Sequence, residues 1–251
     1  MLNRILLRSL FMAALITFLT DCGNEDPKVK TCWLKTSSST GRNTTYVYDG
    51  QNLIQESTSV SGGVMTVTYH YDADGNVIEM DTPLKTTYTY DHDQIVREDT
   101  YAEDGRHYYT EYQYVDGQLT DSQYYYQNAI SGSLEKGQRT HFDYANASSK
   151  NPVKISEYSE PTDTTPYMVE LIEYDDKRNM TNPAFKKIQL LLGYGPDNNV
   201  VKQTWIYASG NTSSASTAYE FNANGYPVKK TVVYTTGDSG TSTYTYDCDP
   251  S

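Results

Sequence analysis

The amino-acid sequence predicts an all-β fold, an antiparallel meander of about 14 to 16 strands curled into a soluble barrel or a strongly curved sheet. The first supporting observation is a strand–turn–strand unit that recurs along most of the chain. The second is the presence of 25 Tyr against only 5 Phe, because Tyr favours strands and its polar tip needs a partner or water. The third is a hydrophobic content of 37%, which suits a sheet with one wet face. The length of 251 residues is compatible with one all-β domain.

The clearest copy of the unit runs from Tyr69 to Glu79, with the sequence YHYDADGNVIE. Tyr69 and Tyr71 are two residues apart, so in a strand they lie on the same face. Asp72 favours a turn start, because its carboxylate can accept hydrogen bonds from nearby backbone N–H groups. Gly75 can adopt a positive φ without steric cost, which the bulged exit of a short hairpin requires. The segment therefore predicts a tight hairpin.

The unit recurs at irregular intervals, which indicates a decayed hairpin repeat rather than a strict solenoid. Residues 221–226 are nearly the same turn with Asn in place of Asp, and shorter versions stand at 46–50, 101–105 and 112–117. Close spacing and short turns predict an antiparallel meander. The expected strands are 31–38, 43–49, 52–60, 63–72, 76–81, 85–91, 94–101, 106–115, 118–127, 138–145, 152–159, 167–175, 199–208, 215–222, 225–236 and 240–248.

One segment, 176–193, interrupts this rhythm. Phe185, Ile188 and Leu192 have the spacing of one helix face, and Pro183 is favourable at a helix start. We therefore expect one short helix near 183–192 that plugs an end or a face of the sheet.

The N-terminus has the layout of a secretory signal. Arg4 and Arg8 form a charged region, and Leu10–Leu19 is an apolar run too short to span a bilayer comfortably. The run ends in Leu-Thr-Asp-Cys, which resembles a bacterial lipobox in which Cys22 is lipidated and becomes the mature N-terminus. The alternative is an ordinary secretory signal with a chance Cys.

This interpretation divides the chain into a signal peptide at 1–21, a lipidated tether at 22–30 and a single all-β domain at 31–251. Acidic residues just after the Cys resemble the surface-export signals of Bacteroidetes-type lipoproteins. The expected location is the outer membrane, lipid-anchored on the cell surface, with the periplasmic face as the alternative. A membrane-spanning barrel is disfavoured because no strand face carries the apolar band that lipid requires.

The charge balance excludes one class of partner. The formal net charge is −12, with 32 acidic and 20 basic residues. An acidic surface repels phosphate backbones, so no nucleic-acid partner is expected. The membrane is expected to be contacted only through the N-terminal lipid.

Four segments together resemble a family of Bacteroidetes lipoproteins of unknown function described as having a porin-like fold. They are Glu173–Asn179, Asn182-Pro183, Leu190–Tyr194 and Tyr219–Val228. The hairpins alone also resemble, more loosely, the tyrosine–aspartate (YD) repeats of Rhs-type proteins. The resemblance implies a soluble sheet curled toward a barrel. It implies no reaction, so no catalytic residue is carried over.

The residues show no recognisable catalytic or metal-binding pattern. Asp72, Asp74 and Asn76 look like part of a calcium loop, but Gly75 comes too early and the hairpin explains each residue. The 4 histidines lack ligand spacing. We expect no metal, no cofactor and no catalytic residue. A hydrolase is the less favoured alternative, since it would need two carboxylates in one pocket with shifted pKa values.

Two ligand or modification sites are candidates. Trp205, Tyr207 and the neighbouring tyrosines are candidates for stacking on sugar rings, but strand alternation favours the interpretation that these rings pack the core. Thr164 lies in Asp163-Thr164-Thr165, which resembles a Bacteroidetes O-glycosylation motif in a Pro-bounded loop; the competing interpretation is coincidence.

With Cys22 used for lipid, Cys32 and Cys248 remain as an even pair in a chain directed to an oxidising compartment. They lie in the first and last expected strands, so a disulfide between them would join the two ends of the meander. That bond would place their Cα atoms about 4.4–6.8 Å apart. The alternative is two separate thiols in an open sheet.

These observations predict a surface lipoprotein that acts as a non-enzymatic binding or structural module, with a glycan or a protein as ligand. The alternative is a carbohydrate-binding accessory lipoprotein, which would expose aromatic rings at a barrel mouth.

Overall fold

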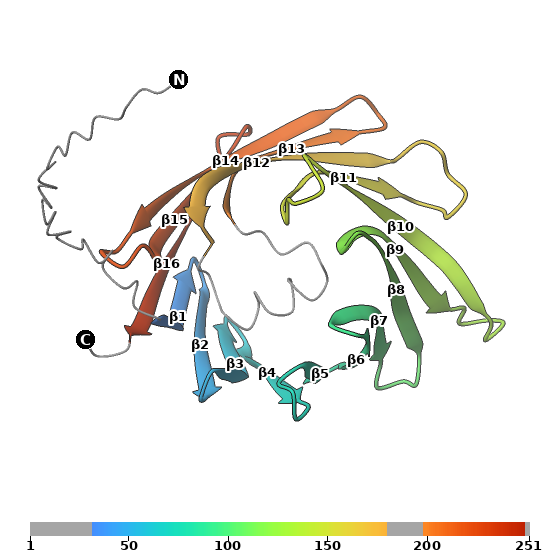
Figure 1. Cartoon of the computed structure of the whole chain (residues 1–251), viewed down its shortest axis with the longest axis horizontal. Coiled ribbons are helices and arrows are strands. Elements are labelled where there is room, and N and C mark those ends of the chain that lie inside the picture. Colours follow the sequence, from blue (N-terminus) through green and yellow to red (C-terminus); the bar gives the residue numbers. More distant parts are fainter. Residues whose placement is uncertain (1–31, 180–197, 249–251) are drawn as a thin grey trace, which may run out of the picture.

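The computed structural model describes residues 32–179 and 198–248. Sixteen strands form one closed barrel in which each strand pairs antiparallel with the next in sequence, and the last pairs with the first (Figure 1). The strands are β1 (Cys32–Ser39), β2 (Arg42–Asp49), β3 (Asn52–Val60), β4 (Gly63–Tyr71), β5 (Val77–Asp81), β6 (Lys85–Asp91), β7 (Gln94–Tyr101), β8 (His107–Val115), β9 (Gln118–Gln127), β10 (Leu134–Tyr144), β11 (Pro152–Tyr158), β12 (Met168–Arg178), β13 (Asn198–Tyr207), β14 (Thr212–Phe221), β15 (Pro227–Tyr234) and β16 (Ser239–Cys248).

The predicted all-β meander is confirmed, and the sheet closes into a barrel. β10 begins earlier than expected, at Leu134, and β12 continues further than expected, to Arg178. Both extensions lie beyond shifts in the pairing register, where irregular residues hide the alternation of a strand. The helix expected near 183–192 falls outside the described residues. In the ranges that the structure covers, no helix is long and apolar enough to cross a membrane.

The two ends of the barrel differ, and we call the end where β1 begins the base and the opposite end the mouth. Near the base, the first inward-facing position of each odd-numbered strand is buried, and Leu53, Val77 and Ile95 have no solvent exposure. These residues pack with Tyr69 in one hydrophobic cluster. The full ring is Leu34, Leu53, Val77, Ile95, Leu119, Pro152, Asn199 and Pro227.

Tyrosines near the base tie neighbouring strands together. Each is close to the end of an even-numbered strand, and its hydroxyl donates to a backbone carbonyl near the start of the preceding odd-numbered strand. For example, the Tyr71 hydroxyl lies 2.6 Å from the Leu53 carbonyl oxygen. The same bond joins Tyr48 to Leu34, Tyr90 to Val77, Tyr114 to Ile95, Tyr174 to Pro152, Tyr219 to Val200 and Tyr246 to Pro227.

The turn at 72–76 has the predicted chemistry. Gly75 has a φ of 78°. The Asp72 carboxylate accepts hydrogen bonds from the backbone N–H groups of Asp74 at 3.0 Å and Asn76 at 2.7 Å. Gly225 has a φ of 81° in the related turn. Because these bonds occupy the Asp72 carboxylate, turn formation accounts for the residues that look like a calcium loop.

A disulfide joins the two ends of the meander. Cys32 and Cys248 are directly opposed in the pairing of β1 with β16, and their sulfur atoms are 2.00 Å apart. Their Cα atoms are 4.0 Å apart, slightly closer than the expected range. Directly opposed residues in antiparallel strands come as close as about 4.5 Å, so the strand pairing accounts for most of this closeness.

Candidate binding site

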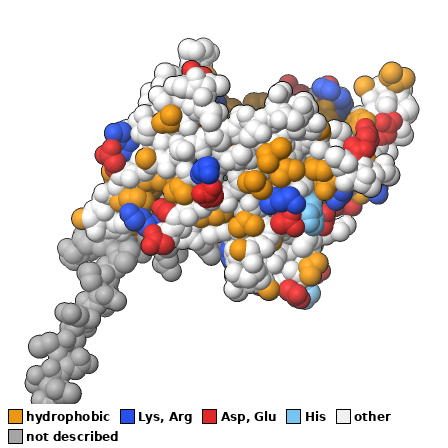
Figure 2. Space-filling view, turned by 90° about the horizontal axis from the view of Figure 1, so that it is seen from above, with side chains coloured by type: hydrophobic (Ala, Val, Ile, Leu, Met, Phe, Trp, Pro, Cys, Tyr) orange, Lys and Arg blue, Asp and Glu red, His pale blue; other side chains and the backbone are white. Residues whose placement is uncertain are grey.

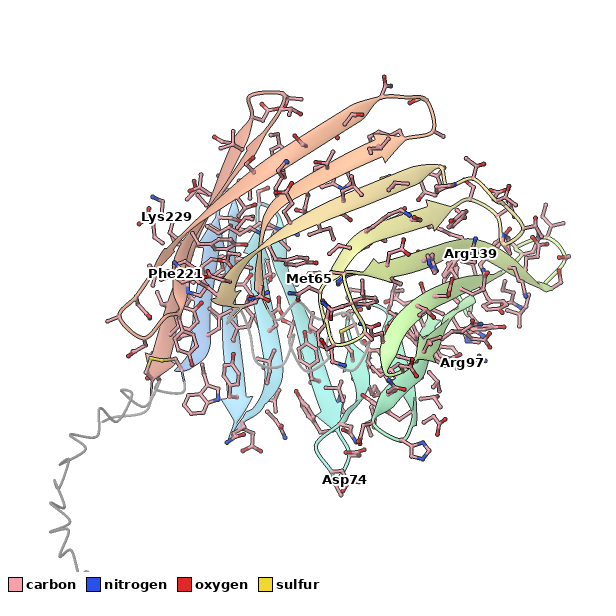
Figure 3. The ribbon with its side chains drawn as sticks, turned by 45° about the horizontal axis from the view of Figure 1, so that its top comes forward. Met65, Asp74, Arg97, Arg139, Phe221 and Lys229 are labelled. Atoms are coloured by element: carbon pink, nitrogen blue, oxygen red, sulfur yellow. A yellow bond between two sulfur atoms is a disulfide. The ribbon has the colours of Figure 1, made fainter. Side chains whose placement is uncertain are left out.

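The inner face of the barrel becomes polar toward the mouth. A cavity of about 470 Å³ opens there between β8 and β12. Its lining combines aromatic rings, hydroxyls, an amide and two carboxylates: Tyr112, Tyr124, Thr140, Gln138, Glu157 and Glu170. Met65 points into the barrel elsewhere, whereas Arg97, Arg139 and Lys229 lie on its outside (Figure 3). Thr140 is adjacent to Arg139 in β10 and so points to the opposite side of the sheet, which places the cavity in the lumen.

Glu157 is held in place by two neighbours at the mouth. The Tyr167 hydroxyl donates a hydrogen bond to its carboxylate, and the Gln138 amide donates another at 2.9 Å. The same amide also donates to the Tyr167 hydroxyl oxygen at 2.6 Å. These three side chains form one connected polar group from β10, β11 and the loop at 159–167.

Glu170 is the second carboxylate of the cavity. Burial raises the pKa of Glu170, the hydrogen bond from the Gln203 amide opposes this, and the Glu157 charge raises it further. The Gln203 bond is 2.6 Å long. In the strand register Ile155 faces Glu170 while Glu157 faces Met168, so the two carboxylates are diagonal neighbours on one face.

The predicted stacking residues lie beside this cavity. Trp205 is directly opposite Glu170, and Tyr207 is directly opposite Met168, which places both on the luminal face near the mouth. The Tyr207 side chain is 39% exposed and Trp205 is half-buried. Among the described residues, neither ring is stacked on another ring and neither side chain makes a hydrogen bond.

The outer face carries a different aromatic group across β7, β8 and β9. Tyr101 stacks on His107 with ring centroids 4.7 Å apart, His107 on Tyr109 at 5.6 Å, and Tyr109 on Tyr125 at 4.3 Å. The Arg97 guanidinium covers the Tyr109 ring at 3.8 Å. The inner rings of this ladder are stacked on their neighbours, which leaves little open aromatic face between them. A sugar ring needs an open aromatic face, so this ladder is a poor platform for one.

One cluster could hold a cation, although the sequence predicts no metal ligands. Ligand atoms of His70, Glu79 and Asp81 lie within 4.8 Å of one another on the outer face of β4 and β5. The His70 ring is already 3.0 Å from Asp81, and the Lys85 ammonium is 2.6 Å from Glu79. Because these bonds occupy the carboxylates, we assign no metal here. The cluster depends on pairing His70 with Glu79, which residue spacing does not reveal.

One of the remaining predicted sites, Thr164, lies within the described residues. Thr164 is exposed in the loop at 159–167, next to the cavity mouth. The Asp163 carbonyl in this loop accepts a 3.4 Å hydrogen bond from Arg139. Cys22 falls outside the described residues. Sequence reasoning missed Glu157 and Glu170; their only sequence signal is that each shares a strand face with buried or aromatic residues, and this is visible only once the pairing is known.

No family model matches the chain, and no curated protein does. The fold is similar to a porin-like protein from Bacteroides uniformis, with a TM-score of 0.56 and 14% identity over 86% of this chain and 95% of that one. A porin-like protein from Bacteroides vulgatus has 15% identity over 86% of this chain and 99% of that one, with a TM-score of 0.43. At 14% identity, the first likeness shows a shared fold and leaves ligand and activity open.

Proposed function

We propose that this protein is a lipid-anchored, non-enzymatic binding module of the outer membrane, whose lumen binds a carbohydrate. The observation that carries the proposal is the position of Trp205, which lies on the luminal face directly opposite Glu170 of the cavity lining. A sugar offers apolar C–H groups to an aromatic face and hydroxyls to carboxylates and amides. The cavity of about 470 Å³ is within the range of small-molecule sites.

The position at which β1 begins supports one orientation of the barrel. β1 begins at Cys32, at the base of the barrel. A lipid on Cys22 would leave a tether of about ten residues, which spans at most about 36 Å. The base would then face the membrane, and the mouth with its cavity would face away from it. We therefore place the open mouth toward the cell exterior, with the periplasm as the alternative.

The outer surface supports anchoring by lipid rather than by the barrel wall. Charged pairs cross the outer face, including Lys202–Glu173 at 2.6 Å and Lys229–Glu220 at 2.7 Å. Figure 2 shows charged and apolar side chains interspersed over the face in view. A membrane-spanning barrel needs a continuous outward apolar band, because charges facing lipid are destabilising.

Direct binding measurements test the carbohydrate proposal. A glycan array would identify a ligand, and titration calorimetry would then compare the wild type with Trp205→Ala. We expect the substitution to weaken binding at least tenfold, about 1.4 kcal/mol. Trp33→Ala is the matched control, because Trp33 neighbours the inward Leu34 and lies on the outer face. Binding that is absent, or equal in the wild type and the Trp205 variant, would refute the proposed site.

The anchor has its own test. Metabolic labelling with a fatty-acid analogue should mark the wild type, and Cys22→Ser should abolish the label and release the protein from membranes or stall its processing. Protease treatment of intact cells should cleave the protein if it is at the surface. An unlabelled mature protein would remove the lipid anchor from the proposal.

A hydrolase is the second candidate, because Glu157 and Glu170 line one cavity and burial raises the pKa of Glu170. Glycosidases use such carboxylate pairs as acid and base or nucleophile. Both carboxylates already accept hydrogen bonds from neighbouring amide side chains, which favours a binding role over a catalytic one. Incubating the array-positive glycan with the protein and measuring new reducing ends decides between the two. Turnover that Glu170→Gln abolishes would replace the binding proposal.

A further inference from the structure

A second luminal group lies on the four strands around the disulfide. Lys230 on β15 is directly opposite Ser242 on β16, Ser242 is opposite Ser39 on β1, and Ser39 is opposite Arg42 on β2. Directly opposed residues share a sheet face, so these four side chains form one row. The row has a cation at each end and two hydroxyls between them.

This row faces the lumen. Ser39, Arg42 and Ser242 line a cavity of about 350 Å³, together with further hydroxyls from Ser37 and Thr44. Sixteen strands complete one turn, so three strand steps rotate the inward direction by about 70° on average. The two strands at the ends are about 14 Å apart along the sheet. Long side chains that start at such positions can extend toward the serines between them.

The two cations have no acidic partner among the residues that the structure covers. Glu56 is the one carboxylate in the cavity lining, and it accepts a 3.3 Å hydrogen bond from the Tyr69 hydroxyl. Lys229, which precedes Lys230, points to the outside and pairs with Glu220 at 2.7 Å. The outer lysine is therefore neutralised while the inner one is not, although the protein as a whole is acidic.

Leaving a half-buried ammonium without a counter-charge is unfavourable. Burial accordingly lowers the pKa of Lys230. An anion in the lumen would remove this penalty. The Arg42 guanidinium lies nearer the rim, is exposed, and offers a planar fork that matches carboxylate and sulfate oxygens. Serine hydroxyls between the cations can donate to the same oxygens.

We propose that Lys230, Ser242, Ser39 and Arg42 form a luminal binding site for an anionic group, a carboxylate or a sulfate. The site is separate from the Trp205 site, because its residues lie on β15, β16, β1 and β2, whereas Trp205 lies on β13 and the first cavity spans β8 to β12. The inference does not depend on neutral-sugar binding. If both sites operate, the lumen selects ligands that carry a negative charge.

Titration calorimetry of the purified protein at low ionic strength tests this site. The probes are sodium sulfate, sodium glucuronate and, as the neutral match, glucose. We expect both anions to bind, and we expect added sodium chloride to lower their affinity. Lys230→Met and Arg42→Gln should each lower the affinity at least tenfold. Lys229→Met should leave it unchanged, because that residue is adjacent in sequence but faces outward.

Arg42 is exposed at the rim, so Arg42→Gln should leave the fold intact. Loss of anion binding in this variant therefore reports on the site and not on misfolding. Trp205→Ala separates the two proposals: it should leave sulfate binding intact. Absence of binding for both anions, or equal binding in the wild type and the Lys230 and Arg42 variants, would overturn the anion site. Glucuronate binding that needs Trp205 but neither cation would overturn it as well, while supporting the carbohydrate site.

Discussion

The Tyr71 hydroxyl donates a 2.6 Å hydrogen bond to the backbone carbonyl oxygen of Leu53, a residue with no solvent exposure. The bond runs from the end of β4 to the start of β3, so it closes the base of one hairpin. Burial raises the pKa of Tyr71, which extends the pH range in which the hydroxyl stays protonated and can donate. The other tyrosines of this set repeat the bond around the base.

Tyr71→Phe should therefore lower the free energy of unfolding by about 1 kcal/mol, because the Leu53 carbonyl loses its partner while the ring stays. Urea denaturation followed by circular dichroism measures this change. Tyr101→Phe is the control, since Tyr101 is 45% exposed on the outer face and its hydroxyl bonds to no described residue. Equal stability of the two variants would contradict a structural role for the bond.

Gly75→Val should destabilise the protein by about 1 kcal/mol or more, because the glycine has a φ of 78° and a β-branched residue is strained there. The matched control is Gly63→Val. Gly63 begins β4, and an added Cβ would meet nothing within 4 Å. A melting midpoint that is unchanged in the Gly75 variant would count against this turn assignment.

Removing the disulfide with Cys32→Ser and Cys248→Ser should lower stability by about 5 kcal/mol at most, because the bond closes a loop of 216 residues. Thermal melts with and without reductant measure the effect. Reductant should lower the melting temperature of the wild type and leave the double variant unaffected. If reduction leaves the wild-type melting temperature unchanged, the bond adds little to the closed barrel.

Burial raises the pKa of Glu98, the Tyr112 hydrogen bond opposes this, and the Asp99 charge raises it further. The folded state therefore holds the Glu98 proton more tightly than the unfolded state. Its contribution to stability is full below the unfolded pKa and is lost as pH rises through the higher folded pKa. Glu98→Gln should stabilise the protein at pH 7, and the gain should vanish toward pH 4.

Melting temperatures of Glu98→Gln and wild type across this pH range check the prediction. Glu103→Gln serves as the control, because Glu103 is exposed in a turn and surface substitutions usually change stability by less than about 0.5 kcal/mol. A gain for Glu98→Gln that is equal at both pH values would show that the effect does not come from the buried charge.

Much of the fold could be predicted from local pattern. Alternating tyrosines indicated strand faces, and Asp72 with Gly75 indicated a hairpin that the structure confirms. The irregular positions were harder to predict. β10 begins at Leu134, four residues before the expected start, and the prediction missed this part because a shift in register separates the two halves of the strand. Such bulges depend on the partner strand and leave little trace in the sequence of one strand.

The candidate site was less predictable. The sequence identified Trp205 and Tyr207 as candidate residues but left open whether their rings bind a ligand or pack the core. Only the strand register shows that Trp205 lies opposite Glu170. The same holds for Lys230 and Arg42, which are 188 positions apart in the numbering and lie in one row only because β16 pairs with β1.

Local patterns specify most strands and turns of this protein, because side-chain alternation and bonds such as those of the Asp72 carboxylate act between residues close in sequence. Closure of the sheet, the choice of the luminal face and the grouping of polar side chains in one cavity arise only in the folded barrel. These features depend on the pairing of whole strands, and a shift of one residue would turn every side chain to the opposite face. Closure adds the pairing of β1 with β16, which brings Cys32 and Cys248 together across nearly the whole described chain.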